Sequence, residues 1–211
     1  MHKQNLISTG SPLNPDTPVL IMLHGRGADA ADILGLASHL HVDGFTLLAP
    51  EATNNTWYPY SFLSPTTENE PWLTSALNLV QGIVTMVKGQ GVPASNIYLL
   101  GFSQGACLTL EFSARNADRY GGIVAFTGGL IGDKVDTSNY KGDFGKTPIF
   151  IGTSDPDPHI PVPRVEESAK VLEQMNGQVM KEIYKNMGHT ITTEEIDSVN
   201  SFIFQKPLHS L

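Results

Sequence analysis

The sequence has little cysteine, little positive charge and no long apolar run. Cys107 is the only cysteine among 211 residues, so an intrachain disulfide and a thiolate metal cluster are both excluded. The 13 Lys and Arg residues face 21 Asp and Glu residues, and the net charge of -8 argues against electrostatic binding of nucleic acid or anionic membranes. No segment approaches the ~20 apolar residues of a membrane span, and the first residues lack the apolar core of a signal peptide. We therefore expect a cytoplasmic protein with no stable membrane association.

Length and composition predict a single globular domain. A chain of 211 residues is long enough for one well-buried core and short for two. Hydrophobic residues make up 40% of the sequence and charged residues 16%, as in ordinary globular proteins. We expect one domain over residues 1–211.

Apolar runs of strand length alternate with segments of helical periodicity. Strands are predicted over residues 19–23, 45–49, 122–126, 148–151 and 179–184, with a further one starting at residue 97. Helices are predicted over residues 28–40, 164–176 and 191–204, with others starting near Pro71 and behind residue 105. Repeated strand–helix units predict a parallel α/β sheet with helices on both faces.

The most informative stretch is 97–105, where an apolar strand runs into Gly-x-Ser-x-Gly before a helical segment. This is the sequence form of a nucleophile elbow, in which a strained turn holds a serine hydroxyl clear of the backbone. Gly101 and Gly105 would let strand and helix cross closely around Ser103. Small residues in an ordinary strand-to-helix turn are the alternative, but the strand before and the helix after favour a nucleophile. Cys107, one helical turn later, is expected to pack as a small apolar residue.

Three segments together resemble one enzyme family. Residues 23–29 (Leu-His-Gly-Arg-Gly-Ala-Asp), residues 101–106 (Gly-Phe-Ser-Gln-Gly-Ala) and the stretch from 152 to 190 look like the small carboxylesterases of the phospholipase/carboxylesterase family, which includes acyl-protein thioesterases. The similarity covers roughly residues 18 to 205. It implies an α/β-hydrolase fold of three layers with a mostly parallel central sheet, a small-molecule ester substrate and no metal or other cofactor. Because family members often pair, it also allows a homodimer.

A serine hydroxyl needs a neighbouring base, and in this fold the base follows the acid in the chain. His189 lies just past the last predicted strand, where a loop can turn its imidazole back toward Ser103, so it is our candidate base. The remaining histidines are weaker candidates: His2, His24, His39, His41, His159 and His209. Of these, His24 is expected to pack or to orient a loop, and His159 comes before the expected position of the base.

Two aspartates compete for the acid that orients the base. The resemblance implies Asp followed by Pro, any residue, an aliphatic residue and Pro. Counting back from Ile160 and Pro161 selects Asp157, whereas counting forward from Gly152 selects Asp155. We favour Asp157, because the aliphatic-Pro pair begins the following helix and should set the geometry. Asp155 would then brace the turn.

The tetrahedral intermediate requires preorganised hydrogen-bond donors, which backbone amides supply. One donor should be the Gln104 N–H, directly after the nucleophile. The resemblance places the second at the Arg26 N–H, although the arginine side chain replaces a residue that is commonly apolar in the family. The family also places an aromatic loop beside the site, so Trp57, Tyr58 and Phe62 are candidates for the substrate pocket.

These residues predict a metal-independent serine hydrolase that cleaves carboxylic esters through an acyl-enzyme. An acyl-protein thioesterase or lysophospholipase is the nearest alternative. A non-catalytic ligand-binding protein on a hydrolase fold is the alternative of another class.

Overall fold

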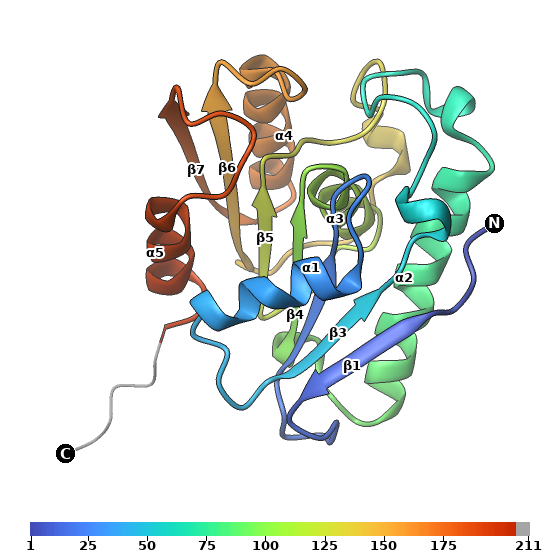
Figure 1. Ribbon diagram of the computed structural model, residues 1–211, viewed down its shortest axis with the longest axis vertical. Coiled ribbons are helices and arrows are strands. Elements are labelled where there is room, and N and C mark those ends of the chain that lie inside the picture. The colour runs from blue at the N-terminus through green and yellow to red at the C-terminus, as the bar shows by residue number, and fades with distance from the viewer. Residues whose placement is uncertain (206–211) are drawn as a thin grey trace.

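The computed structural model of the chain describes residues 1–205 and places seven strands in one sheet (Figure 1). The strand order is β1-β3-β2-β4-β5-β6-β7, and every neighbouring pair except β1 and β3 is parallel. The strands are β1 (Leu6–Gly10), β2 (Val19–Leu23), β3 (Thr46–Pro50), β4 (Ile97–Phe102), β5 (Gly122–Phe126), β6 (Pro148–Asp155) and β7 (Gln178–Lys185). The mostly parallel sheet confirms the predicted α/β class. That residues 1–211 form one domain stays a prediction, and His209 lies outside the described residues.

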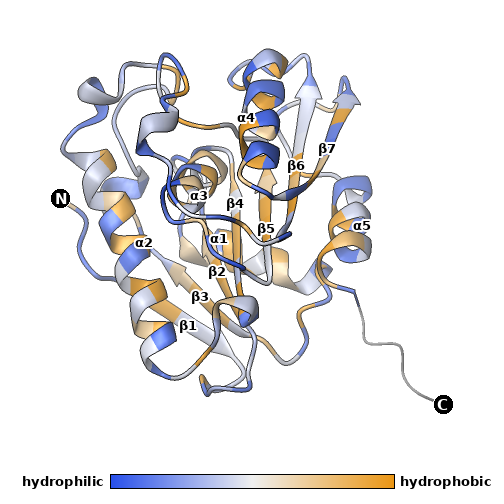
Figure 2. Ribbon diagram, turned by 180° about the vertical axis from the view of Figure 1, so that it is seen from behind, coloured by the Kyte–Doolittle hydropathy of each residue, from blue (hydrophilic) through white to orange (hydrophobic). Residues whose placement is uncertain are grey.

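The central strands are buried because helices cover both faces of the sheet. All five residues of β2, of β3 and of β5 are buried, as expected for parallel strands that read as continuous apolar runs. Helices α1 and α5 contribute to one core cluster, and α2, α3 and α4 contribute to the other. Figure 2, drawn from behind the view of Figure 1, shows hydrophobic segments along the central strands and alternating hydrophobic and hydrophilic segments along helices such as α2 and α4. The sheet therefore forms the middle of three layers.

The helices are α1 (Ala30–Gly35), α2 (Trp72–Gly89), α3 (Gln104–Arg115), α4 (Val162–Gln174) and α5 (Thr193–Phe202). The prediction of one helix over residues 28–40 was wrong in its length. Asp29 caps the helix start by accepting a hydrogen bond from the Asp32 N–H, and the segment after Gly35 tightens into a 3-10 turn over Leu36–His39. No helix within residues 1–205 combines the length and apolar composition needed to cross a membrane.

Strand β1 was not predicted, because its sequence carries no buried apolar run. Only Leu6 of its five residues is even partly buried. The strand pairs antiparallel with β3, placing Leu6 opposite Pro50, and forms one edge of the sheet. Strand β6 is longer than predicted and continues to Asp155, paired with β7 along its whole length. The carboxyl ends of the parallel strands therefore lie at the same edge, where the nucleophile is held.

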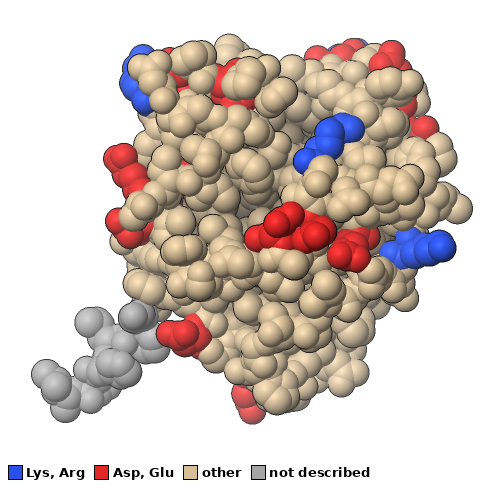
Figure 3. All heavy atoms as spheres, viewed as in Figure 1, with Lys and Arg blue, Asp and Glu red and all other residues tan. Residues whose placement is uncertain are grey.

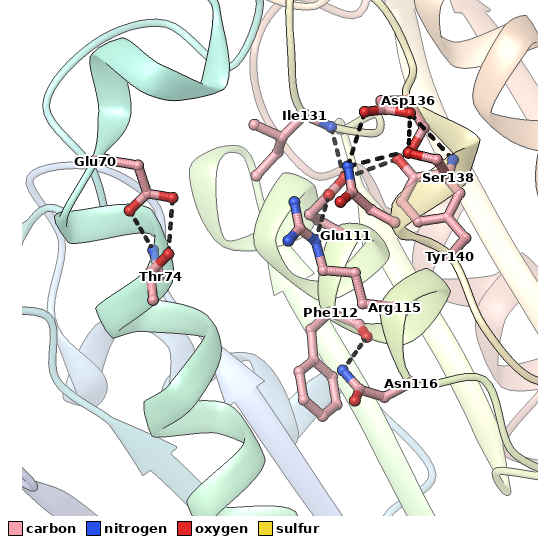
Figure 4. Close-up of polar contacts among 11 residues, drawn as sticks. Glu70, Thr74, Glu111, Phe112, Arg115, Asn116, Ile131, Asp136, Ser138 and Tyr140 are labelled. Carbon is pink, nitrogen blue, oxygen red and sulfur yellow. Dashed lines mark hydrogen bonds and ion pairs between the residues drawn. The ribbon is translucent and has the colours of Figure 1, made fainter.

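The long connection between β5 and β6 is anchored to helix α3 by a buried carboxylate (Figure 4). Glu111 accepts hydrogen bonds from Arg115 Nε at 2.7 Å, from the Ile131 N–H at 3.1 Å and from the Tyr140 hydroxyl at 3.0 Å. The burial of Glu111 is tolerated because both carboxylate oxygens have partners, one of them cationic. The helix behind the nucleophile is thus tied to the loop that crosses it.

Candidate active site

Ser103 occupies a strained turn between β4 and α3. Its φ of 53° and ψ of -118° lie outside the regions that most residues adopt. A Cβ atom on Gly101 would lie 2.3 Å from the Gly105 carbonyl oxygen, and one on Gly105 would lie 2.1 Å from the Leu23 carbonyl oxygen. Only glycine fits either position, so the elbow depends on both glycines.

The structure brings Ser103, His189 and Asp157 into one hydrogen-bonded chain. His189 Nε2 lies 2.8 Å from Ser103 Oγ, and His189 Nδ1 lies 2.8 Å from Asp157 Oδ2. Because an ionised carboxylate only accepts, Nδ1 carries the proton and Nε2 is free to accept the serine proton. His189 lies between β7 and α5, 86 residues beyond Ser103. This geometry is the arrangement that activates a serine hydroxyl.

The carboxylate of Asp157 is buried and fully hydrogen-bonded. Its side chain is 0% exposed, and Oδ1 accepts the backbone N–H groups of His159 and Ile160, both at 2.8 Å. Burial alone would raise its pKa. The hydrogen bonds from His189 and from the two backbone amides outweigh that effect and lower the pKa. Asp157 therefore stays ionised at neutral pH.

Asp155 lies at the end of β6 and does not contact His189. It is held in register opposite Lys185 of β7, with Oδ2 3.3 Å from Lys185 Nζ. Both side chains are open to solvent, at 46% and 82% exposure. The structure thus places Asp157, and not Asp155, beside the histidine, because the extended strand leaves no freedom for the earlier aspartate.

The two residues expected to supply the oxyanion donors, Arg26 and Gln104, line the same cavity as Ser103. Within residues 1–205, neither the Arg26 N–H nor the Gln104 N–H donates to a protein acceptor, so both stay available to a ligand. Gln104 is the first residue of α3, where the helix dipole also favours negative charge. These are the properties that an oxyanion hole requires.

The Gly25 carbonyl, whose direction sets that of the Arg26 amide, accepts hydrogen bonds from the His24 ring and from the Ala28 N–H at 3.2 Å. His24 Nδ1 lies 2.8 Å from the Gly25 carbonyl oxygen, and Nε2 lies 3.1 Å from the Ala52 backbone nitrogen. A carbonyl only accepts and an amide only donates, so His24 is neutral with its proton on Nδ1. Burial lowers the pKa of His24, which favours this state. In a trans peptide the Gly25 carbonyl and the Arg26 N–H point in opposite directions. Holding the carbonyl therefore aims the amide away from it.

A cavity of about 570 Å³ opens beside Ser103 and His189. Tyr58 and Phe62 are among its lining residues, and their role in binding substrate stays a prediction. Leu63, Cys107 and Ile160 also line it and were not predicted from the sequence. Cys107 could have been found from its spacing, since it follows Ser103 by one helical turn. Burial raises the pKa of the Cys107 thiol to about 12, so it acts as an apolar wall and not as a second nucleophile.

Trp57 does not line the cavity, which corrects the prediction made for it. The indole is fully buried in the core, and its Nε1 donates to the His24 carbonyl oxygen at 2.8 Å. The indole packs instead in the hydrophobic core that includes residues of β2 and α2. It therefore supports the oxyanion loop.

Two side chains fasten the aromatic loop to the catalytic elements. Gln104 Oε1 accepts the Trp57 N–H at 2.8 Å, and Gln104 Nε2 donates to the Tyr58 carbonyl at 2.8 Å. The Arg26 guanidinium donates to the carbonyl oxygens of Tyr58, Pro59 and Tyr60 at 2.9, 2.9 and 2.8 Å. Arg26 and Gln104 thus offer their backbone amides to the site and their side chains to the cavity wall.

Comparisons with known proteins agree with this architecture. The family model of phospholipase/carboxylesterase matches residues 5–206. The chain is 52% identical to the crystal structure of a phospholipase/carboxylesterase from Dyadobacter fermentans, covering 97% of this chain and 98% of that one with a TM-score of 0.95. It is 27% identical to acyl-protein thioesterase 1 of Saccharomyces cerevisiae over 94% of this chain and 97% of that protein. Esterase PE8, at 20% identity and a TM-score of 0.79, shares the fold. The chain therefore belongs to the phospholipase/carboxylesterase family of α/β-hydrolases, and it is a hydrolase of the carboxylesterase type.

Proposed function

We propose that the protein hydrolyses carboxylic esters through an acyl-enzyme formed on Ser103. The main support for this proposal is the continuous series of hydrogen bonds from Ser103 Oγ through His189 to Asp157, with both contacts at 2.8 Å. Side chains separated by 86 positions along the sequence meet in the geometry that nucleophilic catalysis needs. Membership of the phospholipase/carboxylesterase family also supports ester hydrolysis.

In the first half of the reaction, Ser103 Oγ attacks the acyl carbon while His189 Nε2 takes the hydroxyl proton. Asp157 stabilises the resulting imidazolium, and the Arg26 and Gln104 N–H groups bind the oxyanion. The tetrahedral intermediate collapses, the bond to the leaving oxygen breaks, and Nε2 returns the proton to the departing alcohol. Water then attacks the acyl-enzyme with His189 as base, which releases the carboxylic acid and restores Ser103.

Covalent labelling tests the nucleophile directly. A fluorophosphonate should modify wild-type protein at Ser103, and Ser103→Ala should lose both the label and at least ~10³-fold in kcat on 4-nitrophenyl butyrate. Labelling that persists in Ser103→Ala would refute the assignment. Absence of any labelling in the folded wild type would favour the non-catalytic, ligand-binding alternative.

A second candidate function is an acyl-protein thioesterase or lysophospholipase, favoured by the relatives named acyl-protein thioesterase 1. We propose the small-molecule ester instead, with its acyl group in the cavity of about 570 Å³, where the buried residues Tyr58 and Cys107 are among the lining residues. A series of 4-nitrophenyl esters from two to sixteen carbons, measured beside acyl thioesters, separates the two. A preference for long acyl chains or for thioesters would overturn our choice.

Two further proposals concern the compartment of the enzyme and its oligomeric state. We propose a cytoplasmic enzyme, as the single cysteine needs no oxidising compartment. Family resemblance suggests a homodimer, which light scattering after size-exclusion chromatography would detect as a mass of twice 22.8 kDa.

A further inference from the structure

The cavity beside Ser103 differs in charge from the rest of the molecule. Acidic residues outnumber basic ones 21 to 13 in the sequence, and acidic side chains are scattered over the face shown in Figure 3. Yet within residues 1–205 the lining of this cavity contains no Asp, Glu or Lys side chain. Its one permanently charged lining residue is Arg26.

The charge of Arg26 has no acidic partner. Of the five N–H donors of a guanidinium, three donate to the carbonyl oxygens of residues 58 to 60. Carbonyls carry dipoles and no net charge, so the positive charge remains. Within residues 1–205 no carboxylate lies within the 4.0 Å limit of an ion pair with it. The acidic residues nearest in sequence, Asp29 and Asp32, instead hydrogen-bond each other's backbone N–H groups at the start of α1.

The guanidinium is also fixed in place and accessible. Three hydrogen bonds to one loop hold it, and Arg26 is nevertheless exposed to solvent. A preorganised cation loses little conformational entropy when an anion binds. It therefore contributes more to the binding free energy than the same charge on a mobile side chain. Arg26 and Ser103 line the same cavity, and the backbone N–H of Arg26 is our proposed oxyanion donor, so the cation extends from a residue of the site itself.

We propose that Arg26 is a specificity-determining residue and that the enzyme prefers esters carrying an anionic group, a carboxylate in the simplest case, close to the scissile carbonyl. The proposal rests on the proposed ester hydrolysis and names the substrate class of that site. An N–H donor of Arg26 that is not bonded to these carbonyls would pair with the anion, and the side chains of Tyr58, Phe62 and Cys107 would receive the apolar part. The anion can sit on the acid or on the alcohol of the ester, and both sources share this chemistry.

Matched pairs of substrates test the charge alone. For the acid side, the 4-nitrophenyl monoester of glutaric acid is compared with the same compound bearing a methyl ester on its free carboxylate. For the alcohol side, 4-butyryloxybenzoic acid is compared with its methyl ester. We expect kcat/KM to favour the anionic member about fivefold in one pair, an effect sized for a partly exposed ion pair. The preference should decrease as NaCl is raised from 0.05 to 0.5 M, because salt screens exposed charges.

Two variants separate charge from loop positioning. Arg26→Gln should remove the preference, while Arg26→Lys should keep part of it, even if both lower turnover of the neutral esters by loosening residues 58 to 60. A wild type without charge preference in either pair, or an unchanged ratio in Arg26→Gln, would overturn the anion subsite while leaving ester hydrolysis intact. Failure to hydrolyse any of the four esters would instead refute the proposed function and the subsite with it.

Discussion

The two sides of Ser103 are built in opposite ways. On the base side, in the loops after β6 and β7, side chains would carry out the chemistry and backbone amides hold them in place. Asp157 is fixed by the N–H groups of His159 and Ile160. On the oxyanion side, in the loops after β2 and β4, backbone amides would carry out the chemistry and side chains hold the backbone. The His24 ring, together with the Ala28 N–H, holds the peptide between Gly25 and Arg26.

This difference determines what each side tolerates. The base side depends on particular functional groups. A replacement of the same shape that changes only charge or protonation should therefore cause a large loss of activity. The oxyanion side depends on the direction of a peptide plane, so the side chain that sets this direction can be replaced by another group with the same hydrogen-bonding pattern. Each of the following experiments exchanges one hydrogen-bonding or titrating group for a close isostere.

The largest effect is expected from Asp157→Asn. The amide has nearly the shape of the carboxylate but cannot stabilise an imidazolium, so kcat should fall by about 10³ to 10⁴-fold. Asp155→Asn is the matched control, two residues away and paired only with Lys185 at the surface, and it should change kcat less than threefold. Steady-state kinetics on one short-chain ester compare the two. Equal losses, or a larger loss in Asp155→Asn, would contradict the assignment of the acid.

A smaller loss is expected when the His24 ring is exchanged for an amide. In His24→Asn the side-chain N–H can still reach the position of Nδ1 and donate to the Gly25 carbonyl, whereas in His24→Gln the polar group reaches the position of Nε2. Misdirecting one oxyanion donor costs about 10² to 10³-fold in kcat. We expect His24→Gln to approach 10²-fold with little change in KM, and His24→Asn to retain clearly more activity.

Thermal unfolding of both His24 variants provides the control for that comparison. Each leaves space in a buried site, so both should lose stability to a similar degree. If kcat follows the loss of stability and does not distinguish Asn from Gln, His24 is a packing residue only.

The smallest effect on turnover, and a clear effect on stability, is expected at Glu195 in α5, which follows the His189 loop. Glu195 is 0% exposed, and its Oε1 has no partner within residues 1–205. Burial raises its pKa to about 7, the Thr192 N–H acts in the opposite direction, and the nearby carboxylates of Glu182 and Glu194 raise it further. Because the folded-state pKa lies above the unfolded value of 4.5, the folded chain binds the extra proton. Stability should therefore be full below about pH 4.5 and should fall as pH rises through 7, by on the order of 3 kcal/mol.

Urea denaturation at several pH values between 5 and 8 measures this dependence. The glutamine of Glu195→Gln cannot titrate. The unfolding free energy of the wild type minus that of the variant should therefore decrease as the pH rises across this range. Glu194→Gln, which removes the charge of an exposed neighbour and leaves the buried carboxyl able to titrate, should show a much smaller change. A difference between wild type and Glu195→Gln that is constant with pH would show that Glu195 keeps one protonation state throughout. Glu111, with an arginine and two further donors, illustrates the opposite case of a buried carboxylate that is fully partnered.

Patterns with a local physical cause were predictable. The apolar runs of β2 and β5 were placed with the bounds that the structure shows, because a strand buried on both faces must be apolar throughout. The elbow at Ser103 was predictable because close crossing of strand and helix requires Gly101 and Gly105. Features that depend on distant partners were not. Strand β1 pairs with β3 through its backbone and shows no apolar pattern. The position of Trp57 depends on core contacts and on its hydrogen bond to the His24 carbonyl, which no local pattern indicates.

The sequence by itself determined the α/β fold class and the serine elbow after the strand that begins at residue 97, since glycine spacing and hydrophobic periodicity are local properties of the chain. Only the tertiary structure decided which of two aspartates faces His189, which way the Arg26 amide points and which side chains line the cavity. These choices follow from hydrogen bonds between segments far apart in the chain, and such contacts exist only once the sheet has brought the strand ends together.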